Sequence, residues 1–392
     1  MLFRSTTRPS AIRVNYGVQR SERGGAAVRA IVSLAALTGS FRDAGGGVQL
    51  STSGGFMLNG AALERPDLGP PARTINMSEL GKALTEVDDP PVKALVVYNS
   101  NPAAIAPNQN RVLCGLSRED LFTVVIEQMQ TDTADYADIL LPATTFLEHN
   151  DLYRSYGHYY LQYAPQLVAP QGEARSNVQI FRALAERMGL PSVCQASDDQ
   201  MIEDALSSGH EFLQGITRER LQREHSVRLN LPEPFLPFAK GGFLTPSGKF
   251  EFHAEPYSPP IESRQGDATL LRQFPLEFLS AKNDDSMNST FGNLAARDQE
   301  TGVLHLHPQD AVSRGIASGD SVRAFNQRGE VVFTAEVSSH VQPGVVQAPS
   351  VRWARLAANR RTANALTSDR LADIGGGPVF YSCLVEVARC AA

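Results

Sequence analysis

The chain has few cysteines, and none of them form a sequence pair. Its four cysteines, Cys114, Cys194, Cys383 and Cys390, include no Cys-x-x-Cys motif, which is the spacing common to zinc sites and iron–sulfur clusters. Neither kind of site can therefore be assigned from this sequence. Scattered free cysteines indicate a reducing compartment rather than a disulfide framework, and we interpret each one as a small buried hydrophobic side chain.

Long hydrophobic runs and an excess of positive charge are also missing. The longest apolar stretch, residues 30–37, is far shorter than the roughly 20 residues that a membrane helix requires, so we expect no membrane span. The net charge of −6 argues against a nucleic-acid partner, which would favour a basic face. The 392 residues, of which 42% are hydrophobic, can bury a large core and predict two or three domains.

Three short apolar runs predict parallel β-strands. Residues 92–98 and 121–126 are β-branched and apolar on both faces, as strands covered by helices must be, and residues 137–141 form a third run. Apolar residues at helical spacing mark residues 77–84 and 177–188 as helices. Alternating strands and helices predict a doubly wound, mostly parallel sheet, which binds its ligand beyond the carboxyl ends of the strands.

Polar side chains follow directly after these strands. They are Asn99 and Asn101, Glu127 and Gln128, and residues 131–133. Amides, hydroxyls and carboxylates at this edge suit a nucleotide, and Thr131 or Asp132 could cap the next helix, whose free amides would favour a phosphate. The alternative is a set of ordinary turns, since Asn-Pro and Asp/Thr clusters end strands in many proteins and the chain has no Gly-rich phosphate fingerprint.

Four motifs occur in a fixed order: Asn-Pro-Ala at 101–103, TDTADYADILLPA at 131–143, Leu-Glu-His at 147–149 and Gly-Glu-Ala-Arg-Ser-Asn at 172–177. This order resembles the molybdopterin-dependent oxidoreductases of the dimethyl sulfoxide reductase type, a group that includes formate dehydrogenases and periplasmic nitrate reductases. The resemblance covers almost the whole chain. It extends to Tyr-Gly-Val-Gln-Arg at 16–20 and to His-Pro-Gln-Asp-Ala at 307–311, Gly-Asp-Ser-Val at 319–322 and Asn-Ala-Leu-Thr at 364–367.

The resemblance implies a fold and a domain organisation. It implies an α/β domain with a doubly wound, mostly parallel sheet, followed by a six-stranded double-psi β-barrel. We place a remnant of an adjoining α/β domain at residues 1–75, a dinucleotide-binding-like α/β domain at 76–265 and the molybdopterin-dinucleotide-binding barrel at 266–392. One helix is expected in the first region, at residues 26–37, and barrel strands are expected at residues 321–326, 330–337 and 345–348.

The resemblance also implies a cofactor, bis(molybdopterin guanine dinucleotide) with molybdenum or tungsten, for two-electron or oxygen-atom transfer. It implies no catalytic side chain and no metal ligand in this chain. Carried over position by position, the implied cofactor contacts are Gln19 in the first region; Asn101, Glu127, Gln128, His149 and Asn177 in the α/β domain; and Ser280, Lys282, Ser286, Asn288, Ser289, Asn364 and Tyr381 in the barrel.

The resemblance implies that the cluster-binding cysteines and the metal ligand belong to an amino-terminal portion that we expect this sequence to lack, so a 4Fe-4S cluster is expected only there. We expect this chain to be the carboxyl-terminal part of a longer enzyme; a truncated gene model, a partial assembly and a split enzyme all stay open. The expected partners are that portion, or a subunit carrying the metal ligand, and an electron-transfer protein. With no export signal in view, the expected location is the cytoplasm.

Two other functions stay open at this stage. One is a stand-alone or split-subunit protein that binds molybdopterin or a guanine nucleotide without redox activity of its own. The other is a degenerate subunit that has kept the fold for assembly only.

His305 and His307 lie two residues apart, so in a strand both imidazoles would face the same side, as in a metal clip. No third ligand is evident nearby. Because His307-Pro308 resembles the family's helix entry, we favour a structural interpretation of both histidines.

Overall fold

The computed structural model describes residues 6–69, 72–190, 195–282, 287–298, 301–350 and 352–390, so Cys194 and Ser286 lie outside the described residues. The chain divides into two compact units. Unit 1 comprises Met1–Asn15, Ala30–Thr74 and Leu141–Ala254, and unit 2 comprises Tyr16–Arg29, Ile75–Leu140 and Glu255–Ala392. The three-domain division expected from the sequence stays a prediction.

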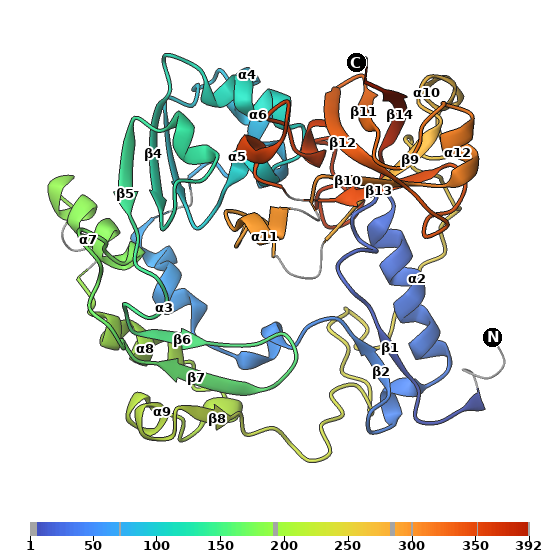
Figure 1. Cartoon of the computed structure of the whole chain (residues 1–392). Coiled ribbons are helices and arrows are strands. Elements are labelled where there is room, and N and C mark those ends of the chain that lie inside the picture. Colours follow the sequence, from blue (N-terminus) through green and yellow to red (C-terminus); the bar gives the residue numbers. More distant parts are fainter. Residues whose placement is uncertain are drawn as a thin grey trace. The chain divides into compact units, whose positions relative to one another are not determined.

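A three-stranded sheet in the order β3-β4-β5 forms the α/β part of unit 2 (Figure 1). Strands β3 and β4 pair in parallel, which confirms the predicted parallel arrangement. Helices α4 and α6 pack Leu84 against Val112 and Leu116, all of which are buried. The elements are α4 (Leu80–Glu86), β3 (Ala94–Tyr98), α5 (Pro102–Ile105), α6 (Gln109–Leu116), β4 (Phe122–Glu127) and β5 (Ile139–Pro142), preceded by a short 3-10 turn at Met77–Glu79.

A closed barrel of six strands forms the rest of unit 2 and confirms the expected barrel. The strand order is β10-β12-β11-β14-β9-β13; β10 with β12 and β13 with β9 are parallel, and the other pairs are antiparallel. The strands are β9 (Leu276–Ala281), β10 (Val303–Leu306), β11 (Ser321–Asn326), β12 (Gly329–Val337), β13 (Val345–Pro349) and β14 (Leu384–Arg389). The helices are α10 (Ala268–Gln273), α11 (Ala295–Asp298) and α12 (Pro308–Val312).

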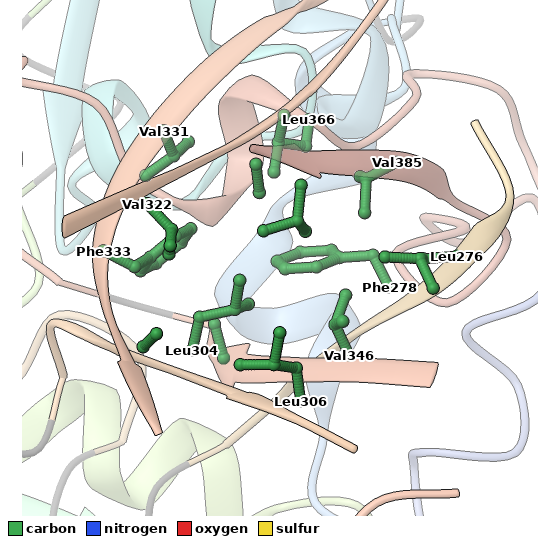
Figure 2. Close-up of a cluster of buried hydrophobic side chains, with 14 of the residues drawn as sticks. Leu276, Phe278, Leu304, Leu306, Val322, Val331, Phe333, Val346, Leu366 and Val385 are labelled. Carbon is green, nitrogen blue, oxygen red and sulfur yellow. The ribbon is translucent and has the colours of Figure 1, made fainter. Parts of the chain in front are cut away.

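Alternation of apolar and polar residues explains the barrel core. In β11, Val322 and Ala324 are fully buried while the alternating Ser321 and Arg323 are exposed, because successive side chains of a strand face opposite sides. Figure 2 shows Phe278 and Leu304 among the apolar side chains that fill this interior. Their burial supplies much of the stability of the barrel.

Unit 1 contains two small sheets and a separate core. Strands β1 (Ala11–Arg13) and β2 (Gly47–Gln49) pair in parallel, and β6, β7 and β8 form an antiparallel sheet. Phe56, Leu161 and Leu221 are fully buried in its core. The remaining elements are α3 (Gly60–Glu64), β6 (Asp151–Tyr153), β7 (Tyr160–Ala164), α7 (Asn177–Arg187), α8 (Asp198–Leu206), α9 (Arg218–Glu224) and β8 (Ser226–Arg228).

The two predicted long helices are present, and hydrogen bonds to the amides of their first turns set where they begin. Ser176 caps α7 in a capping box with Gln179, so α7 begins at Asn177 as predicted. Helix α2 (Gly24–Leu37) begins two residues before the predicted start, because the carboxylate of Asp373 accepts hydrogen bonds from the amides of Gly25 and Ala26. Across the described ranges, no helix combines the length and the hydropathy needed to span a bilayer.

Candidate functional site

The carboxyl edge of β3 and β4 holds a buried polar pair. Asn101 is 1% exposed, and its Oδ1 accepts hydrogen bonds from the Thr133 amide at 3.1 Å and the Thr133 hydroxyl at 2.7 Å. Its Nδ2 and the Oγ1 of Thr131 are buried, and neither has a hydrogen-bond partner among the described residues. Native proteins seldom leave such groups unpaired, so this edge has hydrogen-bonding capacity for a further group.

Two further predicted residues lie at the end of β4, where Glu127 is the last residue of the strand and Gln128 is the first residue after it. Glu127 is half-buried, and its Oε1 accepts a hydrogen bond of 2.8 Å from the amide of Gln128. Burial raises the pKa of the Glu127 carboxyl above its usual value, because burial disfavours the charged form. The side chain of Gln128 is exposed. The sheet thus places both residues at the same edge as Asn101.

Asp132 does not cap the following helix, contrary to the prediction, and neither does Thr131. No side chain caps the short 3-10 helix Thr133–Tyr136. The carboxylate of Asp132 instead accepts hydrogen bonds from the backbone amides of Ala354 and Arg355, at 2.9 and 3.1 Å. A distant segment of unit 2 therefore competes successfully for this carboxylate.

At the rim of the barrel, three predicted contact residues lie beside the turn that contains Gln19. The Lys282 Nζ donates to the Asn288 Oδ1, and the Tyr381 amide donates a hydrogen bond of 2.8 Å to the Arg20 carbonyl. The turn itself is closed by a bond from the Arg20 amide to the Gly17 carbonyl. Gln19 is exposed in this turn.

Arg20 and Lys282 form a pair of like charges at this rim. Burial and the nearby Arg20 guanidinium both lower the pKa of the Lys282 ammonium. The Arg20 guanidinium lies over the ring of Phe380, 5.7 Å from its centroid. Within the described ranges, neither cation has an acidic partner. This arrangement is suited to an anion that would neutralise both charges.

The two described serines of the predicted set have different environments. Ser280 in β9 is 1% exposed, and its Oγ has no hydrogen-bond partner in the part of the chain that the structure describes. The carbonyl of Ser289 accepts a 2.8 Å hydrogen bond from the indole of Trp353. The backbone of Ser289, rather than its side chain, is therefore held in place by the fold.

Asn364 is used to hold the fold together. It is 3% exposed; its Nδ2 donates to the Ala104 carbonyl at 3.0 Å, and its Oδ1 accepts from the Thr367 hydroxyl at 3.2 Å. Both ends of the amide are thus engaged within unit 2. The bond to Ala104 ties the segment before β14 to α5, which follows Asn101.

His149 and Asn177 belong to unit 1. The His149 Nδ1 hydrogen-bonds with the Thr144 hydroxyl at 2.8 Å, and Asn177 is the first residue of α7. Glu148, beside His149, accepts hydrogen bonds from the amide and hydroxyl of Thr145 and from the amide of Gln171. These bonds stabilise the carboxylate and lower the pKa of Glu148. His149 and Glu148 are therefore fixed by local hydrogen bonds.

Two features of the site were not predicted from the sequence. Arg20 is next to Gln19 in the Tyr-Gly-Val-Gln-Arg motif, so its position in that motif is a signal that could have identified it. A small open cavity of about 280 Å³ lies near the residues that follow β4, and no pattern in the sequence pointed to it. The cavity is lined by Met129, Gln130, Asn293, Trp353, Arg355 and Leu356.

The histidines and cysteines have mostly structural roles. His307 is the N-cap of α12, as predicted from His-Pro, and its Nδ1 accepts a hydrogen bond from the Gln309 amide. Among the described residues, no group of three or more His, Cys, Asp or Glu side chains could hold a metal ion. Cys383 is fully buried as predicted, whereas Cys114 is exposed and Cys390 only partly buried, so the prediction is wrong for those two.

Known proteins match both parts of the chain. The family model "Molybdopterin oxidoreductase" matches residues 7–187, and the model "Molydopterin dinucleotide binding domain" matches residues 276–384. The chain is 38% identical to the probable oxidoreductase YoaE of Bacillus subtilis, over 98% of this chain and 57% of that protein. It is 29% identical to the dimethyl sulfoxide reductase DmsA of Escherichia coli, over 98% of this chain and 54% of that protein.

A solved structure shows the same fold. Acetylene hydratase from Pelobacter acetylenicus matches with a TM-score of 0.68 and 24% identity, over 87% of this chain and 50% of that one. The chain thus spans somewhat more than half the length of the curated relatives YoaE and DmsA. Two family models in the expected order and a relative matched along nearly the whole chain identify the family. The chain therefore belongs to the molybdopterin oxidoreductases of the dimethyl sulfoxide reductase type.

Proposed function

We propose that this chain binds the guanine dinucleotide ends of a bis(molybdopterin guanine dinucleotide) cofactor in an oxidoreductase. The observation that carries the proposal is the pair of cations at the barrel rim, Arg20 and Lys282. The pKa of Lys282 is lowered by burial and by Arg20, so the two positive charges repel each other. A pyrophosphate between them would remove that repulsion and accept charge-assisted hydrogen bonds.

The residues around this pair fit the proposed ligand. Gln19 lies next to Arg20 in the same turn, and the Tyr381 amide donates to the Arg20 carbonyl. The buried Ser280 hydroxyl has no partner among the described residues. The unpaired Asn101 Nδ2 at the sheet edge offers a further donor. Neutral amides and hydroxyls beside two cations can bind a pyrophosphate and the edge of a guanine base without covalent attachment.

When bound, the cofactor would supply the redox chemistry, a two-electron or oxygen-atom transfer. The residues of this chain would bind and orient its nucleotide ends. Lys282 and Arg20 would hold the phosphates, Asn288 would orient the Lys282 ammonium, and the amides at the sheet edge would bind the base and ribose.

We also propose partners and a location. The ligand to the metal, together with a 4Fe-4S cluster, would come from an amino-terminal portion or from a separate partner chain, and an electron-transfer protein would exchange electrons with the assembled enzyme in the cytoplasm. One relative, from Halobacterium salinarum, is named as the putative catalytic subunit of a dimethyl sulfoxide reductase, and it is 28% identical over 99% of this chain. That name supports a multisubunit assembly.

The proposal is tested with guanosine diphosphate as a probe for the nucleotide ends. We expect calorimetric titration of the full chain to show binding, and Lys282→Ala or Arg20→Ala to raise the dissociation constant about tenfold, because each removes a charge-assisted hydrogen bond worth roughly 1.5 kcal/mol or more. Lys240→Ala is the matched control, since Lys240 is an exposed lysine of unit 1. An absence of binding, or equal weakening by the control, would contradict the proposal.

A further inference from the structure

The loop that follows β4 is connected to the barrel part of unit 2 through one short turn, residues 353–355. The carboxylate of Asp132 is 5% exposed and accepts hydrogen bonds from two consecutive amides, those of Ala354 and Arg355. Arg355 reaches back in the opposite direction: its Nη2 donates to the Thr131 carbonyl at 2.7 Å. Its Nε lies 3.5 Å from the Asp132 Oδ1. The loop and the turn are therefore joined by reciprocal contacts.

The same turn also holds a second loop. Trp353 is 5% exposed, and its indole Nε1 donates a 2.8 Å hydrogen bond to the Ser289 carbonyl. Gly292 packs against this indole so closely that an added Cβ would lie 2.4 Å from the Trp353 Cδ1. The Arg355 guanidinium lies 5.4 Å from the centre of the Trp353 ring. The residue that binds the first loop therefore lies against the residue that binds the second.

We propose that Asp132, Trp353 and Arg355 form a latch that positions the two loops toward the nucleotide ends of the cofactor. The first loop begins directly after Glu127, the last residue of β4, and carries Gln128. The second loop carries Asn288 and Ser289. None of the three latch residues is itself a proposed contact to the ligand. This inference rests on the proposed function, and it assigns to Asp132 a positioning role in place of the expected helix cap.

The latch makes the two loops interdependent. Replacing Asp132 with the isosteric asparagine leaves one acceptor for two backbone donors and places an NH₂ group against the other donor. Replacing Gly292 with alanine would displace the Trp353 ring without removing any polar group from the first loop. In both variants we expect both loops to open more often, because each disturbs the residues that the loops share.

The test is hydrogen exchange of the full chain without nucleotide, followed by titration with guanosine diphosphate. In Asp132→Asn we expect exchange to rise about tenfold at residues 128–131 and 287–290, as for the loss of one buried hydrogen bond to a charged group. In Gly292→Ala we expect faster exchange at residues 128–131, which the substitution does not touch. We expect guanosine diphosphate to bind more weakly to both variants, and Asp132→Glu to restore part of the affinity of the wild-type chain.

The control is Asp267→Asn. Asp267 also accepts two backbone hydrogen bonds, from the amides of Thr269 and Leu270 at the start of α10, and we expect its replacement to alter exchange only there. Unchanged exchange at 128–131 in Gly292→Ala would overturn the latch. Faster exchange with wild-type nucleotide affinity would overturn its positioning role. Failure of the wild-type chain to bind the probe would count against the proposed function instead, while the exchange data would still decide the coupling.

Discussion

Cys383 illustrates how far one residue's chemistry depends on its surroundings. It is completely buried, and burial raises the pKa of its thiol from 9.0 to about 12. The Sγ donates to the Leu366 carbonyl at 3.2 Å. A thiol that stays protonated is a poor nucleophile, so Cys383 has a structural role, whereas exposure leaves Cys114 open to reagents.

The Cys383 thiol predicts a loss of stability at alkaline pH. Its pKa is higher in the folded chain than in the unfolded one, so its contribution to stability is complete below pH 9.0 and is lost as the pH rises toward about 12. We expect urea unfolding at increasing pH in this window to show a falling free energy of unfolding. Cys383→Ser keeps a hydrogen-bond donor but does not titrate there, so its decline should be shallower. Equal slopes for the two proteins would disprove the assignment.

At the scale of elements, hydrogen bonds join α5 and α6 to the short helix Ala363–Ala365. Gln109 is fully buried; its Nε2 donates to the Ala103 carbonyl, and its Oε1 accepts from the Thr362 amide. Asn364 adds its bond to the Ala104 carbonyl. The sheet part and the barrel of unit 2 are thus linked by buried side-chain amides, which are costly to leave unpaired.

This link predicts that Asn364→Ala destabilises unit 2. Removing the Asn364 amide takes one hydrogen-bond partner from the Ala104 carbonyl and one from the Thr367 hydroxyl. We therefore expect a loss of about 1–3 kcal/mol in the free energy of unfolding. Urea unfolding measures the loss. The exposed Gln327 of unit 2 supplies the control, and Gln327→Ala should change stability by less than about 0.5 kcal/mol. Wild-type stability in Asn364→Ala, combined with weaker nucleotide binding, would return Asn364 to the direct-contact role expected from the sequence.

At the scale of the whole molecule, the described residues contain separate hydrophobic cores in the two units. Phe56 lies in the core of unit 1, and Phe278 lies in the barrel core of unit 2; both are fully buried. Chains with more than one cooperative core commonly depart from two-state unfolding. Each core should therefore govern the unfolding of its own unit.

The two cores predict two separable unfolding transitions. We expect Phe56→Ala to lower the midpoint of one transition and Phe278→Ala to lower the midpoint of the other. Each substitution should reduce the free energy of unfolding of its own unit by about 3–5 kcal/mol, because each opens a cavity. Hydrogen exchange in increasing urea assigns each transition to peptides of one unit. A single transition that both substitutions shift equally would show that the whole chain unfolds as one unit.

The sequence by itself determined the family, some of the strands and two of the longer helices, because these depend on local order. Apolar runs and helical spacing are properties of neighbouring residues, and they located β3, β4, β11 and α7 within a residue or two. The motifs that identify the family are likewise short and contiguous.

Only the tertiary structure decided which polar groups form hydrogen bonds within the fold and which are left to bind a ligand. Asp132 resembles a helix cap in the sequence, yet the amides of Ala354 and Arg355 bind its carboxylate. Asn364 resembles a ligand contact, yet the Ala104 carbonyl engages its amide, whereas Arg20 and Lys282 come together with no acidic partner among the described residues. A hydrogen bond between residues more than 200 positions apart leaves no local pattern, because either partner could serve many other groups.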